Sequence, residues 1–304
     1  MAAVDQAESV EFTDLKRRFN EFLDQDEDQG GYKHKVREML EERGKSSYRL
    51  IVNLDDLRNW NDDLVRGILD KPEQSHVAFQ SALAETAQGI NPDLAKEAQT
   101  VEFYVGYEGS FGTNHVTPRG LTSNYICRLV CVEGIATKIG LVKPKIVRSV
   151  HYCPATQKSQ SKEYRDETSL VGDATGSTYP TKDQEGNPLE TEYGFSTYQN
   201  HQTLTIQEMP EHAPMGQIPC STSVILDDDL ADSCKPGDRV QIIGIYRGLP
   251  TSGKSTHGMF RTSILATNVR VLTKDVRDDS ITDEDVDHIK EVCCECTAVC
   301  VSQQ

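Results

Sequence analysis

Apolar residues recur at helical spacing through about the first hundred residues of the chain. Four such stripes stand out, over residues 12–23, 32–40, 57–69 and 79–87. An acidic, glycine-containing break separates the first two, and Pro72 interrupts the pattern between the last two. Tyr48–Val52 is a short run of β-branched and aromatic residues, which predicts one strand. We therefore expect residues 1–105 to form a helical bundle that contains a single strand.

The pattern changes after Gly106 to short apolar runs separated by turn residues. These runs cover residues 125–132, 134–137, 145–150, 203–207, 224–226, 240–246 and 263–271. Several short strands of this kind predict a small barrel or sandwich over residues 106–274. A polar, tyrosine-bearing segment over residues 151–199 interrupts the series and is interpreted as an inserted lobe. Residues 275–304 are interpreted as an acidic linker and a cysteine-rich tail.

The charge of the chain is strongly uneven. Its 304 residues carry a formal net charge of −16, which by itself argues against nucleic-acid binding. Residues 119–165 nevertheless carry a net charge of +7, and residues 239–274 carry +6. This asymmetry confines the expected nucleic-acid contact to the two basic stretches. The acidic helical region is expected to pack against a neighbouring protein instead.

Composition excludes several classes of protein. The chain is 37% hydrophobic, which is enough for a packed core and argues against global disorder. It has no apolar run of about 18 residues and no secretory signal in Met1–Val10, so neither a membrane span nor export is expected. In the reducing compartment that this implies, the nine cysteines are expected to be thiols.

One motif suggests nucleotide hydrolysis. Residues 248–255, GLPTSGKS, match the P-loop pattern and follow a predicted strand. A phosphate-binding loop also needs a helix directly after its lysine, whereas a β-like run begins here near Phe260. We interpret the segment as the tip of a β-hairpin, whose projecting cations suit contacts with phosphates. A nucleotide hydrolase that uses this loop is the competing hypothesis.

The cysteine pattern gives little support for a metal site. A zinc ribbon needs two pairs of cysteines, whereas residues 151–199 hold only Cys153, with His151 two positions before it. Cys127 and Cys131 lie four apart on a predicted strand and are interpreted as buried core thiols. The tail cysteines near His288 leave metal binding open beside a reduced terminus. No catalytic constellation is found, and no metal or other cofactor is expected in this chain.

Several longer stretches are typical of one family. They are EFYVGYEGSFG at 102–112, VCVEGI at 130–135, KPKIVRSVHYCP at 143–154, TIQEMPE at 205–211, GQIP at 216–219, KPGDRV at 235–240 and FRT at 260–262. Together they resemble the N-terminal region of the minichromosome maintenance (MCM) family of replicative DNA helicases, up to about residue 274. The HYCP segment, which lacks zinc knuckles, is most similar to the third subunit of the eukaryotic hexamer.

The resemblance implies an α+β fold with a helical bundle over residues 1–105 and an OB-fold β-barrel over residues 106–274. The inserted lobe, residues 151–199, would be zinc-ribbon-like but without the usual zinc ligands. In the family the barrels line a ring around DNA, and a basic hairpin, here residues 247–261, points inward. The DNA-binding residues expected on this basis are Arg128, Lys138, Lys143, Lys145, Arg148, Arg247, Lys254 and Arg261. The loop 207–219 would contact an ATPase tier through Gln207, Glu208, Pro210 and Glu211.

The resemblance also implies a DNA-binding and ring-assembly module that acts in the nucleus, in the initiation of replication and in unwinding. The expected partners are single- and double-stranded DNA in a ring channel and other MCM subunits in a hetero-hexamer, but no membrane. The AAA+ ATPase module of the family follows where this chain ends, so the chain alone is not expected to be catalytic. The alternative is a protein-interaction fragment that occupies a ring position without supporting unwinding.

Overall fold

Helices and a short parallel strand pair form the first part of the protein. The computed structural model describes residues 2–24, 31–41, 47–91, 102–166, 169–170, 175, 179–183, 185–249 and 261–272. Within them lie helices α1 (Ala2–Leu23), α2 (Tyr32–Glu41), α3 (Leu54–Trp60), α4 (Asp62–Asp70) and α5 (Pro72–Ile90). Strand β1 (Ser47–Asn53) is the predicted strand, and it pairs in parallel with β2 (Glu102–Glu108). None of the described helices combines the length and apolar character needed to cross a bilayer.

The stripe expected over residues 57–69 is not one helix but two. Asn61 ends α3 and begins α4, and its side chain accepts a hydrogen bond from the backbone N–H of Asp63. Asn53 begins α3 in the same way by accepting from the backbone N–H of Asp55. Asparagine favours such caps because its side chain replaces the missing carbonyl partner of the first turn. The two asparagines therefore start new helices, while the apolar residues of α3 and α4 stay buried on both sides of Asn61.

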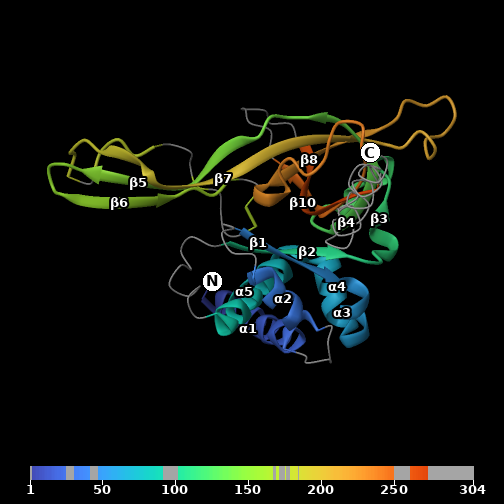
Figure 1. The fold of residues 1–304 in the computed structure, drawn as a ribbon, viewed down its shortest axis with the longest axis horizontal. Helices are drawn as coiled ribbons and strands as arrows, with labels where there is room; N and C mark the ends of the chain where they lie inside the picture. The colour runs from blue at the N-terminus through green and yellow to red at the C-terminus, as the bar shows by residue number, and fades with distance from the viewer. Residues whose placement is uncertain are drawn as a thin grey trace, which may run out of the picture. The chain divides into compact units, whose positions relative to one another are not determined.

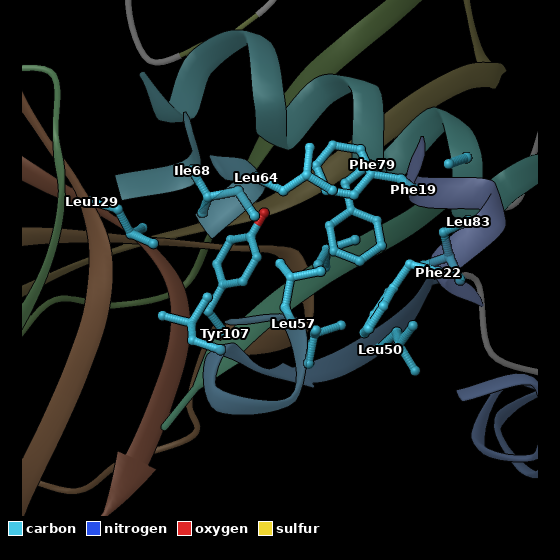
Figure 2. Packing of buried hydrophobic residues seen from close by; sticks show 14 of the residues in the cluster. Phe19, Phe22, Leu50, Leu57, Leu64, Ile68, Phe79, Leu83, Tyr107 and Leu129 are labelled. Atoms are coloured by element: carbon cyan, nitrogen blue, oxygen red, sulfur yellow. The ribbon is translucent and has the colours of Figure 1, made fainter. Parts of the chain in front are cut away.

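Aromatic stacking dominates the helical core. The rings of Phe19 and Phe79 lie 4.4 Å apart at an interplanar angle of 6°, and both side chains are fully buried. Figure 2 shows Tyr107 of β2 and Leu129 among the same side chains. Since Leu129 belongs to the strand region, the core of the helices continues onto the outer face of the sheet that follows. The helical part is therefore packed against the sheet rather than merely tethered to it.

The second part is a closed five-stranded barrel. Its strands are β4 (Leu129–Ile139), β7 (Glu190–Gln207), β8 (Ser221–Asp227), β9 (Arg239–Leu249) and β10 (Arg261–Val271). The order β4-β9-β10-β8-β7 is closed by antiparallel pairing of β7 with β4. Short elements precede the barrel or connect its strands: η1 (Gly112–Asn114), β3 (His115–Val116), η2 (Pro118–Gly120), η3 (Ser123–Tyr125) and η4 (Asp228–Leu230). The α+β class and an OB-like sheet, both predicted from the sequence, are confirmed (Figure 1).

The barrel strands are strongly staggered. Following paired residues round the barrel from Ile139 leads back to Arg128, which lies eleven positions earlier next to the same strand. Such a stagger tilts the strands and lets a small barrel close around side chains alone. Val130 and Val132 point into this interior, whereas Leu129 and Cys131 face the helical core. Both faces of β4 are therefore buried.

The two cysteines interpreted as core thiols have different environments. Cys131 is buried, and burial raises the pKa of its thiol to about 12. Cys127 is exposed and precedes β4 with a left-handed φ of 61°. The expectation that both face the core was wrong for Cys127, because the strand begins only at Leu129 and the period of two does not extend back to it.

A three-stranded lobe extends from the barrel. It contains β5 (Lys143–Cys153), β6 (Lys158–Glu163) and the first part of β7, which pairs with β5 as far as His201 (Figure 1). Strand β7 is 18 residues long. Its first part pairs with β5 in the lobe, and its last part pairs with β8 in the barrel. The lobe's sheet thus begins at Lys143, within the residues that were assigned to the barrel. The predicted limits of 151–199 stay a prediction.

Burial of His76 makes the stability of the helical part depend on pH. The Nδ1 atom of His76 lies 3.1 Å from the hydroxyl oxygen of Tyr107, and its Nε2 lies 3.2 Å from Nε2 of Gln80. Burial, with a smaller contribution from Arg49, lowers the pKa of His76 from 6.5 to about 4. Because the folded pKa is the lower one, the unfolded chain takes up the proton first. Stability is therefore complete above about pH 6.5 and falls as the pH drops towards 4.

The variant His76→Gln should have a flatter pH profile of stability than the wild type. Between pH 7 and pH 5 the wild type should lose about 2 kcal/mol of unfolding free energy that the variant does not lose. Urea unfolding at the two pH values measures this difference. His212→Gln, which changes an exposed histidine of the β7–β8 loop, is the matched control for replacing a histidine by glutamine. Equal pH dependence in the wild type and His76→Gln would contradict the assignment.

Candidate nucleic-acid interface

The strands β9 and β10 form the hairpin that the sequence analysis expected at residues 247–261. They pair in antiparallel register up to Leu249 opposite Arg261, where the side chain of Arg261 is exposed. The predicted contact Lys254 lies outside the described residues. Gly248 is part of strand β9, and the next described element is again a strand. A P-loop is followed directly by a helix, whereas β10 begins at Arg261, and residues 250–260 lie outside the described part of the chain.

Two predicted DNA-binding arginines are held by acids of the helical part. Arg128 lies 3.6 Å from a carboxylate oxygen of Asp70, at the end of α4. Arg247 lies 3.9 Å from a carboxylate oxygen of Glu73, at the start of α5, and donates a 2.8 Å hydrogen bond to the carbonyl oxygen of Ser169. Ion pairs at the base of the hairpin therefore connect the barrel to the corner between α4 and α5. Only part of each guanidinium's hydrogen-bonding capacity is used by these contacts.

Lys138 and Lys143 are the most accessible of the predicted cations outside the hairpin. Both are exposed, and neither forms an ion pair with another described residue. Lys138 lies on β4 opposite Thr205, and Lys143 begins β5 opposite His201. The turn between these strands also exposes Leu141 and Val142. Cations beside apolar side chains, on a surface that projects from the barrel, can contact a phosphate backbone and an adjacent base.

The two remaining predicted cations lie in the lobe. Lys145 is mostly buried and lies 2.9 Å from a carboxylate oxygen of Asp166. Arg148 is half-buried on β5 and lines a groove that also contains acidic side chains. The structure therefore separates the seven described residues of this prediction into Arg128, Arg247 and Arg261 near the β9–β10 hairpin, a β4–β5 pair and these two lobe residues, rather than placing them on one strand face.

The loop between β7 and β8 carries the residues predicted to relay the state of an ATPase tier. Gln207 is the last residue of β7, and Pro210 is exposed. Glu211 is held by Arg239, whose guanidinium donates to both carboxylate oxygens at 2.6 and 3.3 Å. Beyond them, Met215 and Ile218 are exposed near the tip, where Gly216 adopts a left-handed φ of 79°. The loop extends from the barrel end of β7 (Figure 1).

Glu208 is the exception in this loop, because it is only 2% exposed. Arg119 of η2 compensates its charge, with Nε 3.1 Å from one carboxylate oxygen and 3.4 Å from the other. The same guanidinium donates to the side-chain oxygen of Gln217 at 2.7 Å and to the carbonyl oxygen of Ile218 at 2.9 Å. Arg119 thus holds both ends of the loop. Sequence reasoning missed it, since nothing local connects it to residues about 90 positions away.

The lobe does not offer the ligands of a zinc ribbon. Cys153 is its sole cysteine, and the described residues contain no group of three His, Cys, Asp or Glu side chains placed to hold a metal ion. Both ring nitrogens of His151 are engaged, Nε2 at 2.7 Å from Oγ of Ser149 and Nδ1 at 3.1 Å from Oγ1 of Thr191. A buried hydrogen-bond network with Tyr164 therefore occupies the lobe's interior. These residues do not fit a zinc site.

Two family models match the chain. The MCM N-terminal domain matches residues 16–109, and the MCM OB domain matches residues 115–250. The first covers the helical part with the β1–β2 pair. The second covers the strands from β3 to the end of β9, including the lobe.

Curated relatives match over most of this chain. The maternal DNA replication licensing factor mcm3 of Xenopus laevis is 52% identical over 287 residues, which are 94% of this chain and 35% of the relative. The DNA replication licensing factor Mcm3 of Drosophila melanogaster is 52% identical over 263 residues, 86% of this chain and 32% of the relative. The licensing factor MCM3 of Oryza sativa subsp. japonica is 48% identical over 278 residues, 91% and 36% respectively. The chain spans about a third of the length of these relatives.

Proposed function

Because this chain carries the MCM N-terminal and OB domains it belongs to the MCM family, and we propose that it acts in DNA replication as the DNA-binding and ring-assembly module of a helicase subunit. The observation that carries the proposal is the local placement of positive charge on a barrel of an acidic protein. Lys138, Lys143 and Arg261 are exposed on or beside barrel strands, while the whole chain has a net charge of −16. The curated relatives are named as DNA replication licensing factors, which supports a nuclear role.

The proposed mechanism is electrostatic. Lysine and arginine side chains that neutralise phosphates release condensed counterions, so the affinity falls steeply with salt. The hairpin and the β4–β5 turn are the two proposed contact surfaces, on single- or double-stranded DNA in a ring channel. Lys254 extends the hairpin surface in this proposal, and Arg128 and Arg247 join it where DNA phosphates displace the carboxylates of Asp70 and Glu73. Other MCM subunits are the proposed protein partners in a hetero-hexamer.

The triple variant Lys138→Ala, Lys143→Ala, Arg261→Ala should weaken DNA binding and flatten its salt dependence. Each lost phosphate contact reduces the slope of log affinity against log salt by about 0.7 to 0.9. Titration of a fluorescent single-stranded oligonucleotide at several salt concentrations measures this slope. Arg66→Ala, which removes an exposed arginine of α4 paired with Asp62, is the matched control. Binding that does not respond to salt, or an unchanged slope in the triple variant, would rule out the DNA contact.

A second candidate is a protein-interaction module that occupies a ring position without supporting unwinding. The observation that favours it is the engagement of Arg128 and Arg247 by Asp70 and Glu73, since these two cations are partly satisfied within the protein. Co-purification with the other subunits, combined with the DNA titration above, distinguishes the two. Assembly with the subunits in the absence of any DNA contact by this chain would favour the second candidate.

A further inference from the structure

A groove lies on the lobe, lined mainly by residues of β5 and β7. It encloses about 810 Å³ between β5 and the lobe part of β7. Arg148, Val150 and Tyr152 line it from β5, where alternate residues point to the same face. Ser149, His151 and Cys153 point to the opposite, buried face. The groove thus lies over the face of the lobe's sheet that is not buried, and residues outside the lobe also line it.

An irregularity in β7 places aromatic side chains beside this groove. Glu192 pairs with Val150 and Thr197 pairs with Arg148, so the four residues 193–196 loop out of the ladder. Within the loop, Tyr193 is 71% exposed and Phe195, which lines the groove, is 77% exposed. Large apolar side chains that are exposed together commonly mark an interaction site. Irregularities of this kind in a strand are common next to functional sites and at sheet edges.

Hydrogen bonds fix the shape of this looped-out segment. The hydroxyl oxygen of Ser196 accepts from the backbone N–H of Val150 at 3.2 Å and donates to the carbonyl oxygen of Glu192 at 2.8 Å. The hydroxyl of Tyr198 donates to the carbonyl oxygen of Tyr193 at 3.4 Å. The segment is therefore held in place before any partner arrives, which lowers the entropic cost of binding.

The groove runs along an open sheet edge. Between Glu190 and Asn200, strand β7 pairs with β5 on one side, and no other described strand pairs with it there. An edge of this kind offers unpaired backbone N–H and C=O groups to an added strand. Residues 194–199 belong both to this edge and to the lining of the groove. An occupant in an extended conformation could pair with the edge while its side chains enter the groove.

The acidic residues that line the groove favour an occupant with a cationic side chain. Glu192 contributes a carboxylate from β7, Glu102 one from β2 and Asp228 one from η4, against the single cation Arg148. Among the described residues, neither Glu192 nor Asp228 forms an ion pair. Carboxylates next to exposed aromatic rings suit an arginine or lysine, which can combine a charged hydrogen bond with stacking on a ring. The same lining repels the phosphates of DNA.

We propose that this groove binds an extended segment of a partner protein that carries an arginine or lysine side chain. The backbone of the segment adds to the open edge of β7, and its cation pairs with the carboxylate of Glu192 and stacks on the ring of Phe195. Arg148, which was expected to bind DNA, then belongs to a protein-binding surface. The proposal does not depend on whether the barrel binds DNA.

A direct binding assay with the full chain tests the proposal. The probe is a fluorescent peptide of sequence STVRVTS, with STVEVTS and an oligothymidylate of about 20 nucleotides as comparisons. We expect saturable binding of STVRVTS at or below about 1 mM and no measurable binding of STVEVTS. The double variant Glu192→Gln, Phe195→Ser should weaken binding at least about tenfold, because it removes a carboxylate and an aromatic ring from the site. Phe195 is exposed and Glu192 is partly exposed, so the variant should fold.

Ile126→Ser is the matched control, because it removes an exposed apolar side chain from the segment that precedes β4 instead. It should bind STVRVTS as tightly as the wild type. Failure of STVRVTS to bind, equal binding of STVEVTS, or unchanged affinity in the double variant would each overturn the proposal. Competition by oligothymidylate that is lost in the double variant would also overturn it and would assign the groove to nucleic acid.

Discussion

Gly244→Ala should destabilise the whole described fold, although it adds a single methyl group. Gly244 lies in β9 between β4 and β10, opposite Val130 and Ala266. A Cβ atom at this position would fall 2.2 Å from the carbonyl oxygen of Leu265 and 2.8 Å from Cγ2 of Ile264. The first of these is backbone, so the clash cannot be relieved by rotating a side chain. Strands β9 and β10 would have to separate where their hydrogen bonds hold the barrel together.

The expected cost of Gly244→Ala is at least about 3 kcal/mol, at the upper end of typical overpacking in a core. The effect should reach the helical part as well, because Ile243 and Ile245 of the same strand belong to the core shared with the helices. Urea unfolding followed by circular dichroism measures the change. Gly89→Ala is the matched control: the same methyl group meets nothing within 4 Å in α5, and alanine favours the helix. If the two variants are equally stable, close strand approach at Gly244 does not limit the fold.

Arg119→Ala should release the β7–β8 loop and cost about 3 kcal/mol of unfolding free energy. The substitution leaves the carboxylate of Glu208, which is 2% exposed, with no charged partner among the described residues. Removing one member of a buried ion pair costs more than the pair contributes, because the remaining charge stays desolvated. The contacts of Arg119 with Gln217 and Ile218 are lost at the same time. Faster amide hydrogen exchange over residues 208–219 should accompany the loss of stability.

Two comparisons make this second prediction specific. Arg239→Ala removes the ion pair with Glu211, in which both side chains are about half exposed, and should cost less than about 1 kcal/mol. The double variant Arg119→Ala, Glu208→Gln should be more stable than Arg119→Ala alone, because the unpaired buried charge is gone. If Arg119→Ala and Arg239→Ala have equal effects, or if the glutamine does not restore stability, burial of Glu208 is not what makes Arg119 important.

The same contact alters the proposed role of the loop. Glu208 was expected to face an ATPase tier, yet its carboxylate faces Arg119 inside the protein. The exposed side chains nearer the tip are Met215 and Ile218. We propose that these apolar residues make the outward contact, while Arg119 and Glu208 fix the angle at which the loop leaves the barrel. Arg119 is thus a positioning residue for a surface formed by others.

Local patterns in the sequence predicted most of the helices and strands, but not β2, β3 or β6. Stripes at helical spacing predicted the helices, because periodicity records which side of an element is buried. Short apolar runs between turn residues predicted β4, β5 and β7 to β10, although the two runs at 125–132 and 134–137 belong to the single strand β4. The specific stretches from residue 102 to residue 262 identified the family, which the domain matches confirm. The sequence also determined where positive charge is concentrated, since charge is a property of composition.

Only the tertiary structure decided which segments meet. Burial patterns do not name a partner, so the closure of β4 on β7 and the continuation of one long strand from the lobe into the barrel could not be predicted from alternation. The partners of charged side chains could not be predicted from the sequence either. Arg128 lies 3.6 Å from a carboxylate oxygen of Asp70, and Arg119 lies 3.1 Å from one of Glu208, which is 89 positions away in the sequence. Whether an arginine faces DNA, a carboxylate or a peptide groove depends on which elements pack beside it, because electrostatic interactions act over distances in space and not along the chain.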